Sequence, residues 1–175
     1  MPSPESALIA RLRGSDRRSI GASNAVAAAI RRNPGRVSEL VPALFCDDPV
    51  LRMRVADALE KVCRHSPSII QPYRSALLRL ASDSDQPEFQ WHLAQLLRQL
   101  TLTPAQRRRV VVCMQVYLVS SSAIVRTEAL TTLAAMARLD PRLGAGARRL
   151  IDDRLARGSA AERARARQLL REQTD

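Results

Sequence analysis

Apolar residues recur along this chain at the spacing of an α-helix. They return at i, i+3, i+4 and i+7, as among Leu130, Leu133 and Met136, and the alternation typical of a half-buried strand is absent. Proline, glycine and short polar runs interrupt this pattern. Between the interruptions the sequence predicts about ten helices, near residues 4–14, 18–32, 36–46, 50–65, 67–82, 87–101, 104–120, 122–139, 142–157 and 159–172.

Several predicted helices begin with a capping sequence. Thr103 with Gln106, and Ser159 with Glu162, have the spacing of a capping box, in which each side chain binds the other residue's backbone N–H. A helix-capping residue also precedes a proline, which suits the first helical position, at Ser3, Ser66, Thr103 and Asp140.

The second helix of each predicted pair repeats. Residues 51–62, 89–100 and 125–136 align without gaps, and weaker copies surround residues 22–29 and 166–170. If Val26, Leu59, Leu97, Leu133 and Leu170 are equivalent, the repeats are 33, 38, 36 and 37 residues apart. A helix pair of this length cannot bury its apolar stripe alone, so successive pairs are expected to stack. The coinciding apolar positions are Leu51, Phe89 and Val125; Val55, Leu93 and Ala129; Leu59, Leu97 and Leu133; and Val62, Leu100 and Met136.

These repeats resemble the HEAT-repeat family of armadillo-like proteins. Residues 51–59 and 125–133 share an apolar residue, then arginine, then small residues before leucine, which is similar to the second HEAT helix. An aspartate in the preceding turn (Asp47 or Asp48) and a proline within a first helix (Pro42) also fit the family. The middle copy departs from the family because it has Gln90 in place of the arginine.

The resemblance implies an all-α fold, an α-solenoid of about five HEAT-like two-helix repeats stacked with a right-handed sense. None of the predicted loops is long enough for a linker, so residues 1–175 are expected to form a single domain. The end repeats, near 1–34 and 141–175, match the pattern poorly, as expected of repeats that cap a stack.

The resemblance also identifies a candidate binding face. The exposed side of the second helices lines the concave surface of HEAT arrays, which predicts a non-catalytic scaffold or adaptor that binds a protein or peptide partner there. The alternative interpretation is a plain solvated helix face. The predicted partner-binding residues are Asn24, Arg54, Asp57, Arg64, Gln95, Thr131, Arg138 and Gln168.

The net charge of +11 suggests nucleic acid as a second class of partner. Arginine supplies nearly all of the positive charge, since Lys61 is the only lysine in the sequence. Residues 101–150 contain eight arginines and two acidic residues and so contribute +6. Clustered arginines favour sequence-independent contact with DNA or RNA phosphates, although a genome composition rich in arginine codons has the same effect on the count. The arginines that would make these contacts are Arg107, Arg108, Arg109, Arg148 and Arg149.

Catalytic and metal-binding patterns are absent from the sequence. It has no nucleophile elbow and no glycine-rich phosphate loop, and its three cysteines and two histidines lack zinc-ligand spacing. We therefore expect no enzyme activity, no catalytic residue, no metal and no cofactor. One enzyme alternative follows from the resemblance, because some DNA glycosylases have HEAT-like repeats; it requires Trp91 and Asp57 to be exposed together on the concave face.

The cellular location of the protein is predicted from the lack of a membrane span or secretory signal in the sequence and from its few cysteines. No apolar run approaches the roughly 18 residues of a membrane span, and the first residues lack a secretory signal pattern, so no membrane partner is expected. Three cysteines fit free thiols in a reducing compartment. The sequence thus favours a cytoplasmic protein.

Overall fold

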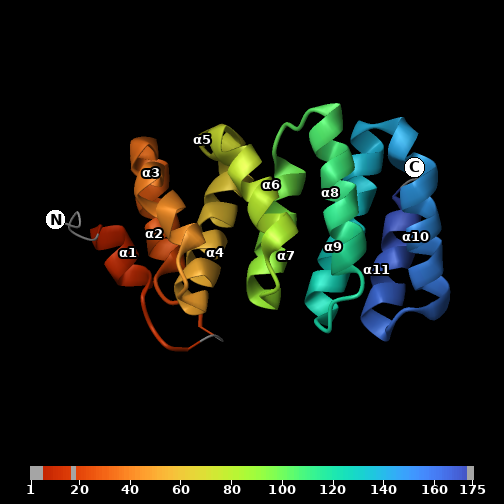
Figure 1. Cartoon of the computed structure of the whole chain (residues 1–175), viewed down its shortest axis with the longest axis horizontal. Coiled ribbons are helices and arrows are strands. Elements are labelled where there is room, and N and C mark those ends of the chain that lie inside the picture. The colour runs from red at the N-terminus through yellow and green to blue at the C-terminus, as the bar shows by residue number, and fades with distance from the viewer. Residues whose placement is uncertain (1–5, 17–18, 173–175) are drawn as a thin grey trace.

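The computed structural model describes residues 6–16 and 19–172, and within these ranges the chain is helical and has no strand. Figure 1 shows the helices following one another along the long axis, with the two ends of the chain at opposite ends of the molecule. The elements are α1 (Ala7–Leu12), α2 (Ser23–Arg32), the 3₁₀ turn η1 (Pro34–Arg36), α3 (Val37–Leu40), η2 (Val41–Phe45), α4 (Pro49–His65), α5 (Pro67–Ile70), η3 (Gln71–Tyr73), α6 (Arg74–Asp83), α7 (Pro87–Gln99), α8 (Pro104–Tyr117), α9 (Ala123–Leu139), η4 (Pro141–Leu143), α10 (Gly144–Arg157) and α11 (Ala160–Arg171).

The second helix of each predicted pair packs against the second helix of the next. Helix α4 contacts α2 and α7, and α9 contacts α7 and α11. The first helices lie against this row, since α6 contacts α7, α8 contacts α9, and α10 contacts both α9 and α11. The fold is therefore all-α, with the second helices packed in a row and the first helices packed against that row.

Both predicted capping boxes are confirmed. The backbone N–H of Gln106 binds the hydroxyl of Thr103, and the Gln106 side chain accepts from the Thr103 backbone. Ser159 and Glu162 make the same reciprocal pair at the start of α11. The predicted start at Ser3 lies outside the described residues.

Two predicted helices are broken by internal prolines. The helix expected over 36–46 becomes α3 followed by η2, and that over 67–82 becomes α5, η3 and α6. Pro42 and Pro72 cause these breaks because proline has no N–H for the helical hydrogen bond. The helix expected over 18–32 begins only at Ser23, and the one expected over 104–120 ends at Tyr117.

The repeating apolar positions form the core. All twelve that coincide between residues 51–62, 89–100 and 125–136 are at most 3% exposed. They belong to one continuous apolar cluster that extends from Leu8 in α1 to Leu169 in α11. Leu170 is only half-buried. No helix in the described part of the chain is long and apolar enough to cross a membrane.

Candidate functional site

The side chains predicted to line the binding face are not equally accessible. We call the outward side of α7, α9 and α11, which carries Gln95, Thr131 and Gln168, the second-helix face. Asn24, Arg64, Arg138 and Gln168 are exposed, Gln95 and Thr131 are half-buried, and Arg54 and Asp57 are buried.

Arg54 lies inside the molecule, so its predicted place on the exposed binding face is wrong. Its guanidinium donates hydrogen bonds of 2.8–3.1 Å to the backbone carbonyls of Leu12, Arg13, Asp16 and Ser19. A planar fork of N–H donors can serve several carbonyls at once, whereas a lysine ammonium cannot match this geometry. Arg54 therefore anchors the connection between α1 and α2 onto α4.

Two glycines allow the backbone to approach this guanidinium. Gly21 has a φ of +53°, in the left-handed region, and a Cβ there would lie 3.0 Å from Cζ of Arg54. A Cβ at Gly14 would lie 2.4 Å from the Nη1 atom of Arg54. These glycines are the sequence signal of a close approach, but they do not show which side chain is approached.

Asp57 is also buried, and its predicted exposure is wrong. The residue is 6% exposed, and Nζ of Lys61 donates to its Oδ2 atom at 2.5 Å. The two side chains are one helical turn apart, a pairing that the i, i+4 spacing already suggests. The DNA-glycosylase alternative requires Asp57 to be exposed beside Trp91, and this requirement is not met.

Glu60 is a buried acid that the sequence reasoning missed. It is 3% exposed, and its carboxylate accepts from Nη2 of Arg64 at 2.7 Å and from Nε2 of Gln99 at 3.1 Å. Gln99 belongs to α7, so this contact joins neighbouring second helices. Arg64 is thus exposed as predicted, but its charge is paired within α4.

A similar contact joins α7 to α9. The Glu128 carboxylate accepts from Nε2 of Gln95 at 3.0 Å and also binds the guanidinium of Arg98. An ion pair joins α9 to the end of α11, with Nη1 of Arg138 3.6 Å from Oε2 of Glu172. A series of polar contacts therefore runs across the second helices from α4 to α11.

His92 lies beneath this series. The residue is 7% exposed, and its Nδ1 atom has no hydrogen-bond partner. Burial lowers the pKa of His92 below the usual histidine value, and the nearby carboxylates of Asp57 and Glu60 oppose this shift without cancelling it. The imidazole is therefore neutral at pH 7 in the folded protein.

Trp91 brings an aromatic side chain to the second-helix face. It precedes Gln95 by one helical turn, so the two share one side of α7. Its ring is half-buried against the core and tilted by 58° to the His92 ring, with the ring centres 5.4 Å apart. Further along this face, between α9 and α11, lies a hollow of about 320 Å³ lined by Thr127, Ala161, Ala164, Arg165 and Gln168.

The predicted phosphate-binding arginines divide into paired and unpaired groups. Nη1 of Arg107 donates to the Leu102 carbonyl at 2.7 Å, and Arg148 pairs with Asp152 at 3.0 Å. The other three arginines are exposed and make no ion pair among the described residues: Arg108, Arg109 and Arg149.

Arg107 has a further structural contact with Asp140. Hydrogen bonding from Arg142 holds the pKa of Asp140 below its usual range. The charge of Arg107, whose Nε atom is 3.9 Å from Oδ2 of Asp140, acts in the same direction. Arg107 is half-buried, so it is engaged in the contact between the start of α8 and the end of α9.

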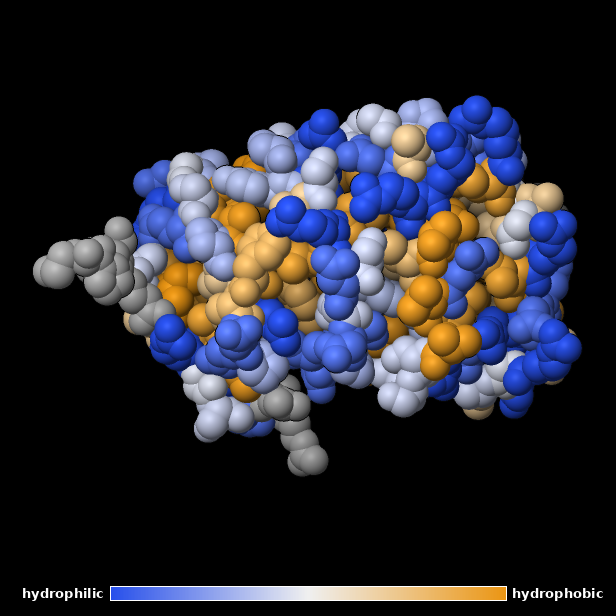
Figure 2. Space-filling view, in the orientation of Figure 1, coloured by the Kyte–Doolittle hydropathy of each residue, from blue (hydrophilic) through white to orange (hydrophobic). Residues whose placement is uncertain are grey.

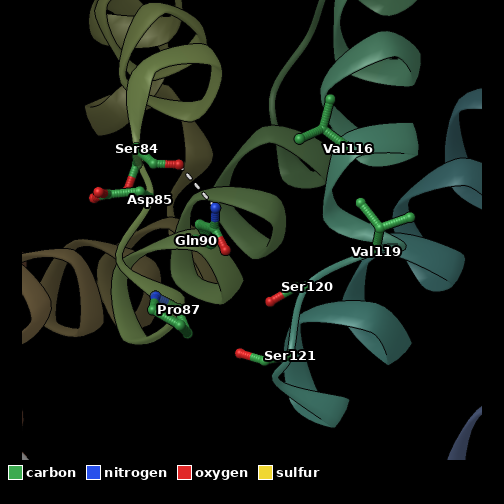
Figure 3. A pocket seen from close by; sticks show the side chains of 8 residues that line it. All are labelled: Ser84, Asp85, Pro87, Gln90, Val116, Val119, Ser120 and Ser121. Carbon is green, nitrogen blue, oxygen red and sulfur yellow. Dashed lines mark hydrogen bonds between the residues drawn. The ribbon is translucent and has the colours of Figure 1, made fainter.

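A second hollow, of about 340 Å³, lies between the turn from α6 to α7 and the turn from α8 to α9 (Figure 3). On one side the Ser84 carbonyl accepts from Nε2 of Gln90 at 2.8 Å. On the other side, Val116 and Val119 form an apolar wall. The remaining residues that line this hollow are Asp85, Pro87, Ser120 and Ser121.

The three cysteines are free thiols. Burial raises the pKa of Cys63 to about 12, which keeps this thiol protonated and unreactive at neutral pH. Cys113 is buried, and Cys46 is half-buried rather than fully in the core. Within residues 6–16 and 19–172, no group of three or more His, Cys, Asp or Glu side chains is placed to hold a metal ion.

Comparisons with protein-family models, with curated proteins and with solved structures give no match to this chain.

Proposed function

We propose that this chain is a non-catalytic scaffold of stacked HEAT-like helix pairs, which binds a protein partner on its second-helix face. The proposal of an α-solenoid is supported by the regular spacing of the repeats, 33–38 residues, and by the order of contacts from α2 through α4, α7 and α9 to α11. Such a stack presents equivalent positions of successive helices as one continuous surface.

The observation that carries the proposal is the position of Trp91. A half-buried tryptophan beside Gln95 offers an apolar contact next to amide groups that can bind a peptide backbone. Thr131 and Gln168 extend the same polar surface over α9 and α11, where the hollow between these helices can accept a side chain. Most of the charged groups near this surface are paired with each other, which favours a polar or apolar partner segment over a highly charged one.

The test compares two exposed positions that receive the same new charge. Gln168→Arg places a bulky cation at the hollow, whereas Ala145→Arg places one on the exposed side of α10. We expect affinity capture from the native cell extract to retain its protein partner with wild type and with Ala145→Arg, and to lose it with Gln168→Arg. Circular dichroism should show equal helicity in all three proteins.

Nuclease treatment of the extract separates the two classes of partner. A partner that depends on the second-helix face remains bound after treatment, because no phosphate backbone mediates the contact. Loss of all partners after nuclease treatment, or equal capture by Gln168→Arg and wild type, would contradict the proposal. The first of these outcomes would favour phosphate binding by Arg108, Arg109 and Arg149.

A further inference from the structure

The outward side of α8 and the turn that follows this helix carry exposed valines. Val112, Val116 and Val119 are 60, 61 and 77% exposed, whereas Val110 and Met114 on the opposite side are fully buried. Val112 and Val116 are one helical turn apart on the same side of α8, and Val119, in the turn after Tyr117, lines the same hollow as Val116. Figure 2 shows hydrophobic atoms running along α8 on the face toward the viewer. We call these three valines the valine stripe.

The valine stripe adjoins a hollow. Val116 and Val119 form one wall of the space between the two helix turns, and Pro87 and Gln90 lie on its other side (Figure 3). A volume of about 340 Å³ accommodates a large apolar side chain. The stripe thus combines an apolar ridge with an adjacent recess, the arrangement found where a helix docks into a groove.

The opposite end of the stripe is positively charged. Arg108 and Arg109 are exposed within one helical turn before Val112, and neither makes an ion pair with any residue that the structure describes. They lie in the second turn of α8. Acidic groups from outside the chain would compensate for these unpaired charges.

These features indicate what kind of partner the stripe fits. A second copy of this chain also carries a net charge of +11, so association of two copies is opposed by repulsion. A row of three valines is also far smaller than the roughly 800 Å² per partner of a standard protein interface. A single helix covers such a row, and an acidic end would complement the arginines.

We propose that the valine stripe binds an amphipathic helix of an acidic partner protein. The apolar side chains of that helix cover Val112, Val116 and Val119, one of them enters the hollow beside Val116, and its acidic residues pair with Arg108 and Arg109. This site lies on a first helix and is independent of the proposed partner site on the second-helix face.

The test uses a synthetic probe, a fluorescent 18-residue helical peptide with leucines at i, i+4 and i+7 and four glutamates at one end. A scrambled peptide of the same composition is its control. We expect the probe to bind in fluorescence anisotropy and the scrambled peptide to bind at least about tenfold more weakly, because only the ordered peptide matches both the apolar row and the charged end.

Two pairs of matched variants localise the binding. Val116→Ser with Val119→Ser should weaken probe binding about tenfold through loss of apolar burial, whereas Ile20→Ser, at another exposed apolar residue, should not. Arg108→Glu with Arg109→Glu should weaken it as strongly, whereas the same change at Arg31 and Arg32 on α2 should not. All substituted side chains are exposed, so the folded structure is retained.

Three outcomes would overturn the proposal. The first is the absence of probe binding or equal binding of the scrambled peptide. The second is equal weakening by the control variants, which would show a general attraction of the acidic peptide to a basic protein. The third is a concentration-dependent dimer in sedimentation experiments that Val116→Ser abolishes, which would make a second copy the occupant of the stripe.

Discussion

His92 illustrates how burial outweighs nearby charge for a single residue. Two carboxylates, Asp57 and Glu60, lie near its ring and favour protonation, yet the pKa remains below the usual value because the ring is removed from water. The positive charge of Lys61, which is paired with Asp57, lowers the pKa of His92 further. The neutral imidazole is a consequence of packing between α4 and α7.

This lowered pKa makes the stability of the protein depend on pH. The unfolded chain takes up a proton at His92 below about pH 6.5, whereas the folded chain resists protonation, so acidification favours unfolding. We expect the unfolding free energy to fall by up to about 1 kcal/mol between pH 7 and 5.5 through this group. Urea unfolding at several pH values measures the change.

Substitutions of the two histidines assign this pH dependence. His92→Gln should flatten the dependence between pH 7 and 5.5, whereas His65→Gln should not, because His65 is exposed at the end of α4. Equal pH dependence in wild type and His92→Gln would refute the role given to His92.

At the scale of elements, α4 is the most deeply buried helix, and side chains along it hold other segments in place. Arg54 binds the connection between α1 and α2, and Glu60 binds Gln99 of α7. The side chains of α4 therefore connect segments about 40 residues apart in the sequence.

Removal of the Arg54 guanidinium should release the connection between α1 and α2. We expect Arg54→Ala to lower the unfolding free energy by about 3 kcal/mol, because four hydrogen bonds with a charged donor are lost within a largely buried site. Arg54→Lys should recover little of this stability, since an ammonium cannot reach the same carbonyls.

Denaturant unfolding measures this effect, and limited proteolysis locates it. Cleavage between α1 and α2 should become faster in Arg54→Ala. It should remain unchanged in the control Arg31→Ala, which removes an exposed arginine from α2. Wild-type stability in Arg54→Ala would show that the four hydrogen bonds are replaced by water without cost.

At the scale of the whole molecule, contacts between neighbouring helices dominate. Helix α4 packs against α2 and α7, and α9 packs against α7 and α11. Helices α2 and α11, at the two ends of the row, are therefore connected through the helices between them. In such an arrangement stability is a sum of local terms, and a defect at one end is felt mainly there.

Two buried isoleucines at opposite ends test this locality. Ile151→Ala in α10 and Ile30→Ala in α2 each remove a fully buried side chain and should each cost about 2–4 kcal/mol. We expect amide hydrogen exchange to accelerate in α9, α10 and α11 in the first variant, and in α1, α2 and α4 in the second. Uniform acceleration in both variants would show that the chain unfolds as one cooperative unit.

Several features of the candidate site were predictable from local spacing. The pairs Asp57 with Lys61 and Glu60 with Arg64 are four residues apart on a predicted helix, so their ion pairs required no tertiary information. The contacts of Glu60 with Gln99 and of Glu128 with Gln95 were not predictable, because each joins helices more than 30 residues apart.

The valine stripe shows where the hydrophobic pattern becomes ambiguous. Val110, Val111 and Val112 are consecutive, so they lie on several sides of a helix and the pattern does not indicate which side faces the core. Packing against α6 and α9 buries Val110 and leaves Val112 exposed. The exposed side was therefore determined by the neighbouring helices.

By itself, the sequence determined that this chain is helical, where α8 and α11 begin, and which apolar positions of its second helices form the core. These features depend on capping residues and on spacing within a single helix, which are local. Only the tertiary structure decided that Arg54 and Asp57 are buried and that Trp91 and the valine stripe remain accessible. Accessibility depends on what covers a side chain, and here the covering segments come from distant parts of the chain.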